Sequence, residues 1–360
     1  MFLLLTAHCS LLTYMKIVLR GTNWIGDAVM TIPALKELRR LFPDAEIFLH
    51  TRSWAKGIFQ DADFIDGILT FENQGSKIKT VLAEAKNLKQ QNFDLSVLFT
   101  NSFESALTAK LANVPRRFGY AKEGRSFLLT DSIEIPVWKN ERHEVFFYLN
   151  LIAEIENSFF STQTVFQNEP QVDLPVSDER KIEARKILEE SGVDLSKPTV
   201  ALGVGSTNSR AKRWPTAGFA ELNDRLQNDL KANVVLVGAK NETDVAREVF
   251  EKSKIKPVIL TGETSLAEAV AVLSEVNLLI SNDMGLAHIA PAVGTKTLVI
   301  FGPTNPKTTQ PVGSEMIRRE DVDCSPCMLR DCPIDHRCMT WISVQEVFER
   351  VGKIFNAKAQ

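Results

Sequence analysis

Short apolar runs alternate with longer segments of helical periodicity along most of the chain. In the first half, the apolar runs predict β-strands over 16–20, 45–50, 65–70, 94–99 and 133–135. Between the first two runs, apolar side chains recur at helical spacing over 28–41, which predicts a helix that ends before Pro43. Strands that alternate with helices indicate a parallel sheet covered by helices on both faces.

The alternation weakens over 157–198, where Pro170, Pro175 and Pro198 surround one predicted helix at 178–191. It resumes at residue 199, with strands predicted over 199–203, 233–238, 257–260, 277–281 and 297–301 and helices over 216–230, 242–251, 265–274, 284–293 and 343–356. We therefore expect an α/β protein of two doubly wound domains. Ligands of open α/β sheets bind beyond the carboxyl ends of the strands.

The first 14 residues are apolar and contain no Lys or Arg. They are shorter than the roughly 20 residues that span a bilayer, and they lack the charged start of a secretory signal. Because Met15 opens the first strand, we interpret 1–14 as an extension upstream of the true start; a weak interfacial anchor is the alternative. The predicted organisation is an N-terminal domain over 15–165, an interdomain region over 166–197, a C-terminal domain over 198–342 and a final helix over 343–360.

Composition and charge exclude several classes of protein. With 44% hydrophobic and 24% charged residues, the chain has the composition of a globular domain rather than of a disordered or fibrous protein. The net charge of −3 provides no basic field for nucleic acid. No segment after residue 14 is long and apolar enough to cross a membrane.

Four of the five cysteines lie within residues 324–338, as Cys324, Cys327, Cys332 and Cys338. Such clustering is unlike the disulfide framework of a secreted protein and favours the cytoplasm. The C-x2-C-x4-C-x5-C spacing fits either a structural zinc site or a loop of free thiols. A catalytic zinc is disfavoured, because four protein ligands leave no open position.

The sharpest chemical signal of the second half is the segment Ser281–His288, which joins a predicted buried strand to a predicted helix. Asn282 and Asp283 are suitable helix N-cap residues. Gly285 lets a ligand approach the backbone, and the free amides of Met284, Gly285 and Leu286 can bind an anion such as a pyrophosphate. His288, one turn further, can add a donor. A well-capped core helix is the alternative.

Two other loops of the second half carry weaker signals of the same kind. Gly203–Thr207 follows a strand and precedes a cluster of cations that includes Lys212, which suits phosphate binding. A solvated basic loop is the alternative. Glu242 follows another strand, where a carboxylate can accept hydrogen bonds from ribose hydroxyls.

In the first half, Gly21 and Gly26 have P-loop spacing, but Asp27 stands where that loop needs a lysine. A carboxylate at the start of a helix and beyond a strand can act as a general base for an acceptor hydroxyl. The alternative is that Asp27 only caps the helix over 28–41.

Five motifs of the chain are considered together. They are WIGDAVMTIPALKELRRLFP at 24–43, NSFESALTAKLANVPRRFGY at 101–120, AKRWP at 211–215, TGE at 261–263 and SNDMGLAHIAPAVGTKTLVIFGPTNP at 281–306. In this order they resemble glycosyltransferase family 9, the ADP-heptose:lipopolysaccharide heptosyltransferases, and the type II enzymes in particular. The resemblance implies a GT-B fold, in which two Rossmann-like domains face each other across a cleft. The N-terminal domain would bind the acceptor, the C-terminal domain would bind the ADP-sugar, and the final helix would return to the N-terminal domain.

The same resemblance implies inverting transfer of heptose from ADP-L-glycero-D-manno-heptose to the first heptose of the lipopolysaccharide inner core. The acceptor would be a Kdo-lipid A glycolipid, met by a cytoplasmic enzyme at the cytoplasmic face of the inner membrane. Asp27 would be the base, and the implied donor-binding residues are Thr207, Lys212, Glu242, Asp283, Met284, Gly285, Leu286 and His288. Asn101, Ser102 and Arg116 would contact the acceptor. The chemistry would need no cofactor.

Two other functions are compatible with the sequence. One is a sugar-nucleotide epimerase of GT-B fold, and the other is a family member that binds lipid or a partner without turnover. Asp27, Lys212 and the 281–288 segment occur together, which disfavours a chain that has lost its activity.

Overall fold

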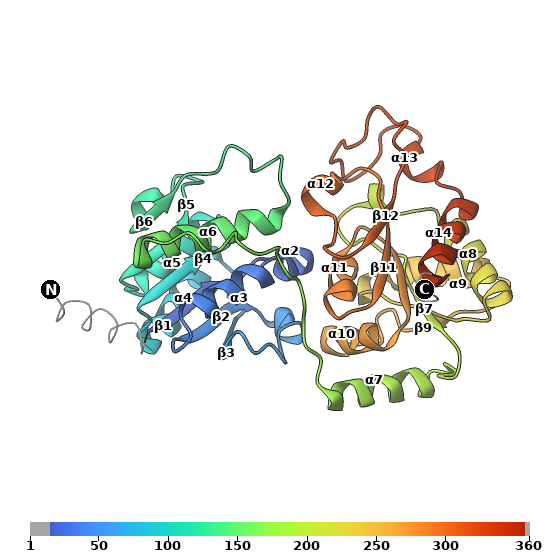
Figure 1. The fold of residues 1–360 in the computed structure, drawn as a ribbon, viewed down its shortest axis with the longest axis horizontal. Helices are drawn as coiled ribbons and strands as arrows, with labels where there is room; N and C mark the ends of the chain where they lie inside the picture. Colours follow the sequence, from blue (N-terminus) through green and yellow to red (C-terminus); the bar gives the residue numbers. More distant parts are fainter. Residues whose placement is uncertain (1–14, 357–360) are drawn as a thin grey trace. The chain divides into compact units, whose positions relative to one another are not determined.

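The computed structural model describes residues 15–356, and the chain divides into two compact units between Gln171 and Val172 (Figure 1). The predicted extension over 1–14 lies outside the described residues. Both units are α/β, and every strand pair in both sheets is parallel.

The first unit contains a six-stranded sheet in the order β3-β2-β1-β4-β5-β6. Its strands are β1 (Lys16–Arg20), β2 (Glu46–Arg52), β3 (Gly67–Phe71), β4 (Leu95–Leu98), β5 (Arg116–Tyr120) and β6 (Asp131–Ile133). Its helices are α2 (Ile25–Met30), α3 (Ile32–Leu41), α4 (Lys77–Gln91), α5 (Phe103–Leu111) and α6 (Glu144–Phe160), with short 3-10 turns η1 (Ser53–Gly57) and η2 (Ser126–Leu128). Because α3 packs on α6 and α4 on α5, the helices form two layers.

The second unit repeats this topology, with the strand order β12-β11-β10-β7-β8-β9. Its strands are β7 (Thr199–Gly203), β8 (Asn233–Leu236), β9 (Val258–Ile259), β10 (Leu278–Asn282), β11 (Lys296–Ile300) and β12 (Glu315–Ile317). Its helices are α7 (Asp178–Glu190), α8 (Thr216–Asp229), α9 (Thr243–Lys252), α10 (Leu266–Glu275), α11 (Gly285–Ala292), α12 (Pro306–Thr309), α13 (Arg337–Thr340) and α14 (Val344–Asn356), with 3-10 turns η3 (Arg210–Lys212) and η4 (Lys240–Glu242). The predicted class, α/β with two Rossmann-like units of GT-B type, is confirmed.

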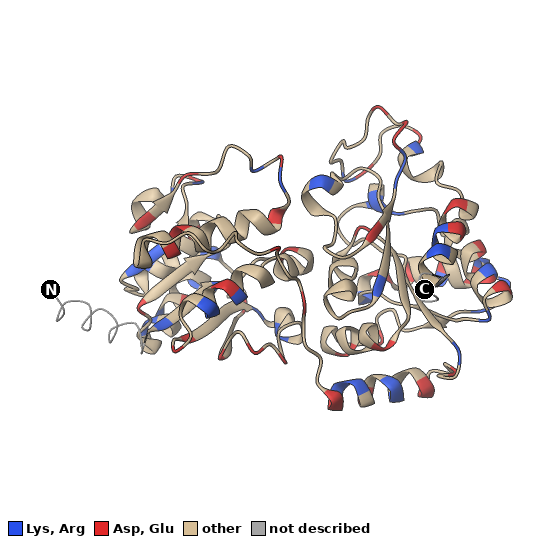
Figure 2. Ribbon diagram, in the orientation of Figure 1, with Lys and Arg blue, Asp and Glu red and all other residues tan. Residues whose placement is uncertain are grey.

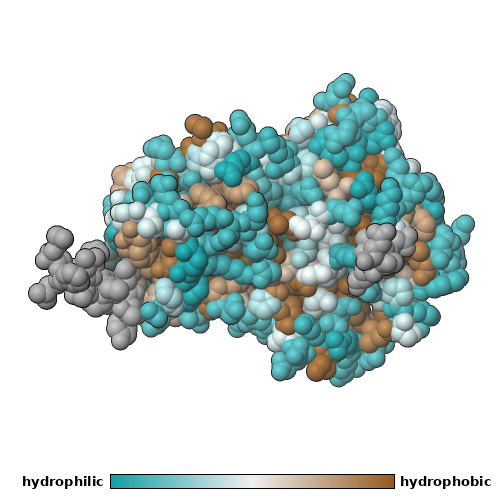
Figure 3. Space-filling view, in the orientation of Figure 1, coloured by the Kyte–Doolittle hydropathy of each residue, from teal (hydrophilic) through white to brown (hydrophobic). Residues whose placement is uncertain are grey.

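Central strands are apolar because both of their faces are covered. All five residues of β7 and of β10 are buried. The main core of the second unit gathers the apolar side chains of its central strands with those of α8, α9 and α14. Charged residues of both signs are interspersed along the elements of each unit (Figure 2), and the surface seen in Figure 3 is mostly hydrophilic.

Several elements differ from the sequence prediction, and three of them show why. The single helix predicted over 28–41 is two helices, α2 and α3, separated at Thr31 just before Pro33. Strands β5 and β12 were not predicted, because their residues (RRFGY and EMI) carry charged side chains and form no apolar run.

The C-terminal helix, predicted to return to the N-terminal domain, packs within the second unit. Val347, Val351 and Ile354 of α14 lie in the main core of that unit, and α14 packs against α8. Across residues 15–356, no helix has the length and apolar character needed to span a bilayer.

Candidate active-site residues

Each sheet has one switch point, which is a pair of neighbouring strands on either side of which the chain adds its further strands in opposite directions. In the first sheet this switch point lies between β1 and β4, and in the second it lies between β7 and β10. Loops at the carboxyl ends of such strands form the usual ligand site of an open α/β sheet. Asp27 follows β1 and Asn101 follows β4, while Lys212 follows β7 and Asp283 follows β10. The topology thus brings these four predicted site residues to the switch points of their sheets.

Lys212, Asp283 and Thr304 form a compact polar cluster in the second unit. Lys212 Nζ and Thr304 Oγ1 each donate to Asp283 Oδ2, both at 2.7 Å. Asp283 is only 5% exposed, whereas the Lys212 side chain is 26% exposed. An ionised carboxylate only accepts hydrogen bonds. Asp283 therefore holds the ammonium group in place and cannot itself donate to a phosphate through its side chain.

Asn282, fully buried at the end of β10, ties two loops together. Its Oδ1 accepts from the backbone amide of Trp214 at 2.9 Å. Its Nδ2 donates to the carbonyl oxygens of Val204 at 2.9 Å and Gly205 at 3.1 Å. One side chain thus fixes both the loop after β7 and the chain immediately after Lys212. The sequence analysis assigned Asn282 only to helix capping and missed this connection.

Glu242 lies beneath the loop that follows β7 and is 2% exposed. Its carboxylate accepts from the Ala239 amide at 2.9 Å and from Thr207 Oγ1 at 3.2 Å. A Cβ atom on Gly205 would lie 2.2 Å from Glu242 Cδ, so any larger residue at this position would displace the Glu242 carboxylate. Glu242 thus supports the loop, and Thr207, which is exposed, hydrogen-bonds to it.

Helix α11 begins beside this cluster, with Met284 as its N-cap and without a side-chain hydrogen bond to the cap. The prediction that Asn282 or Asp283 caps this helix is wrong, because both side chains are engaged by the neighbouring loops. Helix geometry leaves the first-turn amides of Gly285 and Leu286 without intrahelical partners. His288 lies one turn further along and is 6% exposed.

In the first unit, Asp27 lies in the first turn of α2, whose N-cap is Trp24. The Tyr148 hydroxyl, from α6, donates to Asp27 Oδ1 at 3.2 Å. Burial, followed by the charge of Asp27, raises the pKa of Tyr148 well above its ordinary value. Tyr148 therefore stays a neutral donor to the carboxylate at any physiological pH. Asp27 is not the residue that caps α2, and its contact with Tyr148 was not foreseen.

The loop after β4 is organised by Arg125, a fully buried residue that the sequence analysis did not single out. Its Nη2 donates to Asn101 Oδ1 at 3.1 Å, and its Nη1 donates to the carbonyl oxygens of Thr100 at 2.6 Å and Ser102 at 3.2 Å. Burial lowers the pKa of Arg125 to about 10. The Ser102 hydroxyl accepts from the Ser105 amide and caps α5. Asn101 and Ser102 are thus held in one rigid turn beside the first switch point.

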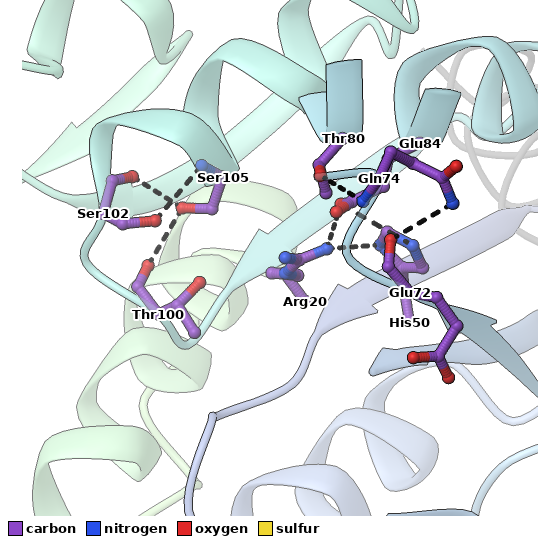
Figure 4. A network of polar contacts seen from close by, with 9 residues as sticks. All are labelled: Arg20, His50, Glu72, Gln74, Thr80, Glu84, Thr100, Ser102 and Ser105. Atoms are coloured by element: carbon purple, nitrogen blue, oxygen red, sulfur yellow. Dashed lines mark hydrogen bonds and ion pairs between the residues drawn. The ribbon is translucent and has the colours of Figure 1, made fainter. Parts of the chain in front are cut away.

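A second buried network fixes the end of β1, from which the loop carrying Asp27 departs (Figure 4). Arg20 is paired with Glu84 of α4 and lies 3.1 Å from His50 Nδ1. Because a guanidinium only donates, His50 Nδ1 accepts and the ring proton lies on Nε2. Burial, followed by the charge of Arg20, lowers the pKa of His50 well below its ordinary value, which keeps the ring neutral.

Arg116, predicted to contact the acceptor, lies away from Asn101 and Ser102. It begins β5 and therefore stands at the amino edge of the parallel sheet, opposite the edge where ligands bind. Its guanidinium donates to both carboxylate oxygens of Asp131, at 3.0 and 2.8 Å, and to Ser158 Oγ at 2.9 Å. These contacts give Arg116 a structural role in the first unit.

The four clustered cysteines have free thiols. Cys324 and Cys327 are exposed, Cys332 is partly buried and Cys338 is buried, and burial raises the pKa of Cys338 to about 11. Among residues 15–356, no group of three or more His, Cys, Asp or Glu side chains is arranged so that it could hold a metal ion. The described thiols therefore do not form a ligand set, and the zinc site stays a prediction.

Comparisons with known proteins agree with this geometry. Residues 81–337 match glycosyltransferase family 9 (heptosyltransferase). The chain is 27% identical to lipooligosaccharide heptosyltransferase 2 of Campylobacter jejuni over 94% of this chain and 99% of that protein. It is 25% identical to lipopolysaccharide heptosyltransferase 2 of Escherichia coli, over 83% of this chain and 86% of that protein.

Solved structures give the same fold. ADP-heptose lps heptosyltransferase II of E. coli superposes with a TM-score of 0.82 at 24% identity, covering 96% of this chain and all of that one. The E. coli heptosyltransferase WaaC with ADP superposes with a TM-score of 0.69 at 17% identity, covering 94% of this chain and 100% of that one. The two Rossmann-like units and the family match over most of the chain lead to one conclusion: the protein belongs to glycosyltransferase family 9, the heptosyltransferases.

Proposed function

We propose that this enzyme transfers heptose from ADP-L-glycero-D-manno-heptose to the first heptose of the lipopolysaccharide inner core, with inversion at the anomeric carbon. The observation that carries the proposal is the Lys212–Asp283–Thr304 cluster beside the first turn of α11, at the switch point of the second sheet. The names of the type 2 relatives from C. jejuni and E. coli support this choice of reaction.

On the donor side, Lys212 is the cation assigned to the diphosphate, and its ion pair with Asp283 offsets part of its attraction for that group. Two unit charges about 4 Å apart interact by about 4 kcal/mol at an effective dielectric constant of about 20. A helix N-terminus contributes about 0.3–2 kcal/mol to an anion. We assign Lys212 and the amides of Gly285 and Leu286 to the diphosphate, with Asp283 acting through Lys212. As the sugar leaves, the charge that grows on the diphosphate is stabilised by groups already in place.

The nucleoside side of the donor is assigned to the loop after β7. Thr207 is exposed beside Glu242, and Glu242 is the carboxylate assigned to the ribose hydroxyls. Gly205 allows this loop to lie directly on Glu242. His288, on the same helix as the phosphate-binding amides, is assigned a supporting donor role.

On the acceptor side, Asp27 is the proposed general base. A sugar hydroxyl is a poor nucleophile at neutral pH, and a positioned base contributes about 10²–10⁴-fold to its reaction. Tyr148 orients the carboxylate through its hydrogen bond to Asp27 Oδ1. Attack by the activated hydroxyl opposite the departing diphosphate is a single displacement, and it inverts the anomeric carbon. Asn101 and Ser102 are the proposed acceptor contacts.

None of these steps passes through a metal ion or another cofactor. We propose a cytoplasmic enzyme that meets its Kdo-lipid A acceptor at the face of the inner membrane, because the acceptor is a membrane lipid. The acceptor's own heptose provides the hydroxyl that attacks the donor.

The test is release of ADP from ADP-heptose by the purified chain, with and without a monoheptosylated Kdo-lipid A. The proposal predicts acceptor-dependent release and a product heavier by one heptose, whose anomeric configuration is opposite to that of the donor by NMR. ADP release or sugar epimerisation without acceptor would instead indicate an epimerase. Binding of the acceptor without any ADP release would indicate a non-catalytic family member.

A further inference from the structure

The Cys-rich segment, residues 324–338, lies directly against the short turn η3 that carries Lys212. The Ala211 amide donates to the carbonyl oxygen of Arg330 at 2.9 Å. Ser209 Oγ donates to the same carbonyl at 3.2 Å, and Arg210 Nε lies 2.6 Å from Asp331 Oδ1. Each of the three residues before Lys212 therefore contacts the Cys-rich segment.

His336 closes this contact from the other end of the segment. Its Nε2 lies 2.6 Å from the carbonyl oxygen of Ala211, and because a carbonyl only accepts, Nε2 is the protonated nitrogen. Ala211 is thus held by both its amide and its carbonyl. A turn of three residues has too few hydrogen bonds of its own to define its position, and η3 has no side-chain cap.

The same segment also holds the loop on the other side of Asp283. Ser325 Oγ donates to the carbonyl oxygen of Gly302 at 2.7 Å, and the Met328 amide donates to that of Pro303 at 2.8 Å. The next residue is Thr304, which donates to Asp283. Lys212 and Thr304 are the two partners of the Asp283 carboxylate. Each directly follows a residue, Ala211 or Pro303, that is hydrogen-bonded to the Cys-rich segment.

The segment itself is anchored at both ends. Val322, just before it, lies in the main core of the second unit, as do Cys338 at its end and Met339 just after it. A Cβ atom on Gly302 would lie 3.2 Å from Cys338 Sγ and 2.4 Å from Sδ of the following residue, Met339, so the end of the segment and the 302–304 loop are in close contact. Because both ends of the segment are anchored in the core, its hydrogen bonds to Ala211 hold η3 in a fixed position.

We propose that the Cys-rich segment is a clamp that positions Lys212 and Thr304 around Asp283, and that His336 is a positioning residue for the phosphate-binding lysine. The clamp works through hydrogen bonds of the chain between Ser325 and His336. This inference rests on the proposed role of Lys212 toward the donor diphosphate. It gives the segment a function in the transfer reaction, which the four cysteines alone did not suggest.

The test compares His336→Ala with two matched variants. His336→Gln keeps a side-chain N–H that can reach the Ala211 carbonyl, and Arg337→Ala removes a neighbouring exposed side chain that pairs with Asp335. Binding of ADP and of AMP is measured by calorimetry for each variant, in the wild-type background and in Lys212→Met. Hydrogen exchange of the amides of 209–213 is followed in the protein without ligand.

We expect His336→Ala to weaken ADP binding about tenfold, which corresponds to the loss of one well-placed hydrogen bond. AMP binding should change less, because AMP lacks the second phosphate. His336→Gln should restore most of the ADP affinity, and Arg337→Ala should leave it unchanged. In the Lys212→Met background the effect of His336→Ala should disappear, since both changes act on the same contact.

Equal weakening of ADP binding by His336→Ala with and without Lys212 would overturn the proposal, as would unchanged ADP affinity. Should the wild-type chain bind no ADP, the proposed function fails, whereas hydrogen exchange still tests the clamp. Faster exchange over 209–213 in His336→Ala but not in Arg337→Ala supports the clamp, and equal exchange in both refutes it.

Discussion

Asn282 offers the most direct test of how the donor loops are held together. Its amide makes three hydrogen bonds, one from Trp214 and two to the carbonyl oxygens of Val204 and Gly205. All of these groups are buried, so Asn282→Ala leaves a backbone amide and two carbonyl oxygens without partners in a space closed to water. Asn282→Asp has the same shape but turns the donor end into a carboxylate oxygen.

The expected loss follows from the number of bonds. A buried hydrogen bond contributes about 1 kcal/mol net, so removing three lowers the free energy of unfolding by about 3 kcal/mol. For a unit of 150–250 residues, such a loss lowers Tm by roughly 6–12 °C. Asn282→Asp should cost at least as much at pH 7, because its carboxylate faces two carbonyl oxygens. It should cost less at pH 5, where a protonated carboxyl group can donate to one of them.

The assay is differential scanning calorimetry of the whole chain at pH 7 and pH 5, with urea denaturation as an independent measure. Gln345→Ala, which removes an exposed hydrogen bond to Arg225 on α8, is the control and should shift Tm very little. A loss below about 1 kcal/mol for Asn282→Ala, set against the three expected bonds, would refute the reasoning. An Asn282→Asp variant more stable than Asn282→Ala at pH 7 would refute it as well.

Four further predictions concern other residues of the two units. Gly205→Ala should weaken ADP binding at least tenfold, since its Cβ displaces the Glu242 carboxylate from Ala239 and Thr207; unchanged affinity by calorimetry would contradict this. Tyr148→Phe should lower kcat about tenfold with little change in KM, because Asp27 loses the hydrogen bond that orients it while the acceptor loses no contact. If Tyr148 only bound the acceptor, steady-state kinetics would instead show a raised KM and an unchanged kcat. Burial alone would raise the pKa of Glu156, but hydrogen bonds from Thr162, Thr164 and Val165 outweigh burial and lower that pKa. The ionised Glu156 therefore stabilises the folded protein fully above the ordinary carboxyl pKa, and this stabilisation is lost as the pH falls through the pKa of Glu156 in the folded protein. Urea denaturation between pH 7 and pH 3 should therefore show a steeper acid loss of stability in the wild type than in Glu156→Gln. Finally, Cys324→Ser with Cys327→Ser should retain wild-type Tm and turnover, because none of the hydrogen bonds described for the clamp uses a cysteine side chain. Loss of bound zinc together with stability would instead establish the metal site.

Much of the fold could be predicted from the sequence because the central strands carry continuous apolar runs. The predictions of 16–20 and 199–203 coincide with β1 and β7, each covered on both faces. Strand β5 escaped the same reasoning. It begins with Arg116, which pairs with Asp131, and Arg117, which donates to the carbonyl oxygen of Leu128. These partners lie more than ten residues further along the chain, so no local sequence pattern predicts them.

The sequence predicted those site residues that follow the end of a strand, but it did not predict the contacts that these residues make with partners far away in the chain. Asp283 stands immediately beyond β10 and Asp27 lies in the first turn of the helix that follows β1, so their positions followed from the alternation of elements. Asp283 binds Lys212, 71 residues away, and Asp27 binds Tyr148, 121 residues away. Such pairs arise from topology and packing. The same holds for Arg125, whose five guanidinium contacts converge only once the β4–α5 turn has formed.

In the proposed reaction, Asp27 activates the acceptor while Lys212 and the start of α11 hold the donor. The decisive measurement is single-turnover transfer by wild type and Asp27→Asn, with ADP-heptose and a monoheptosylated Kdo-lipid A, alongside ADP affinity for both proteins. We expect a rate at least about a hundredfold lower in the variant, with ADP affinity unchanged because the groups assigned to the donor belong to the second unit. Full transfer by Asp27→Asn would contradict the assignment of the base.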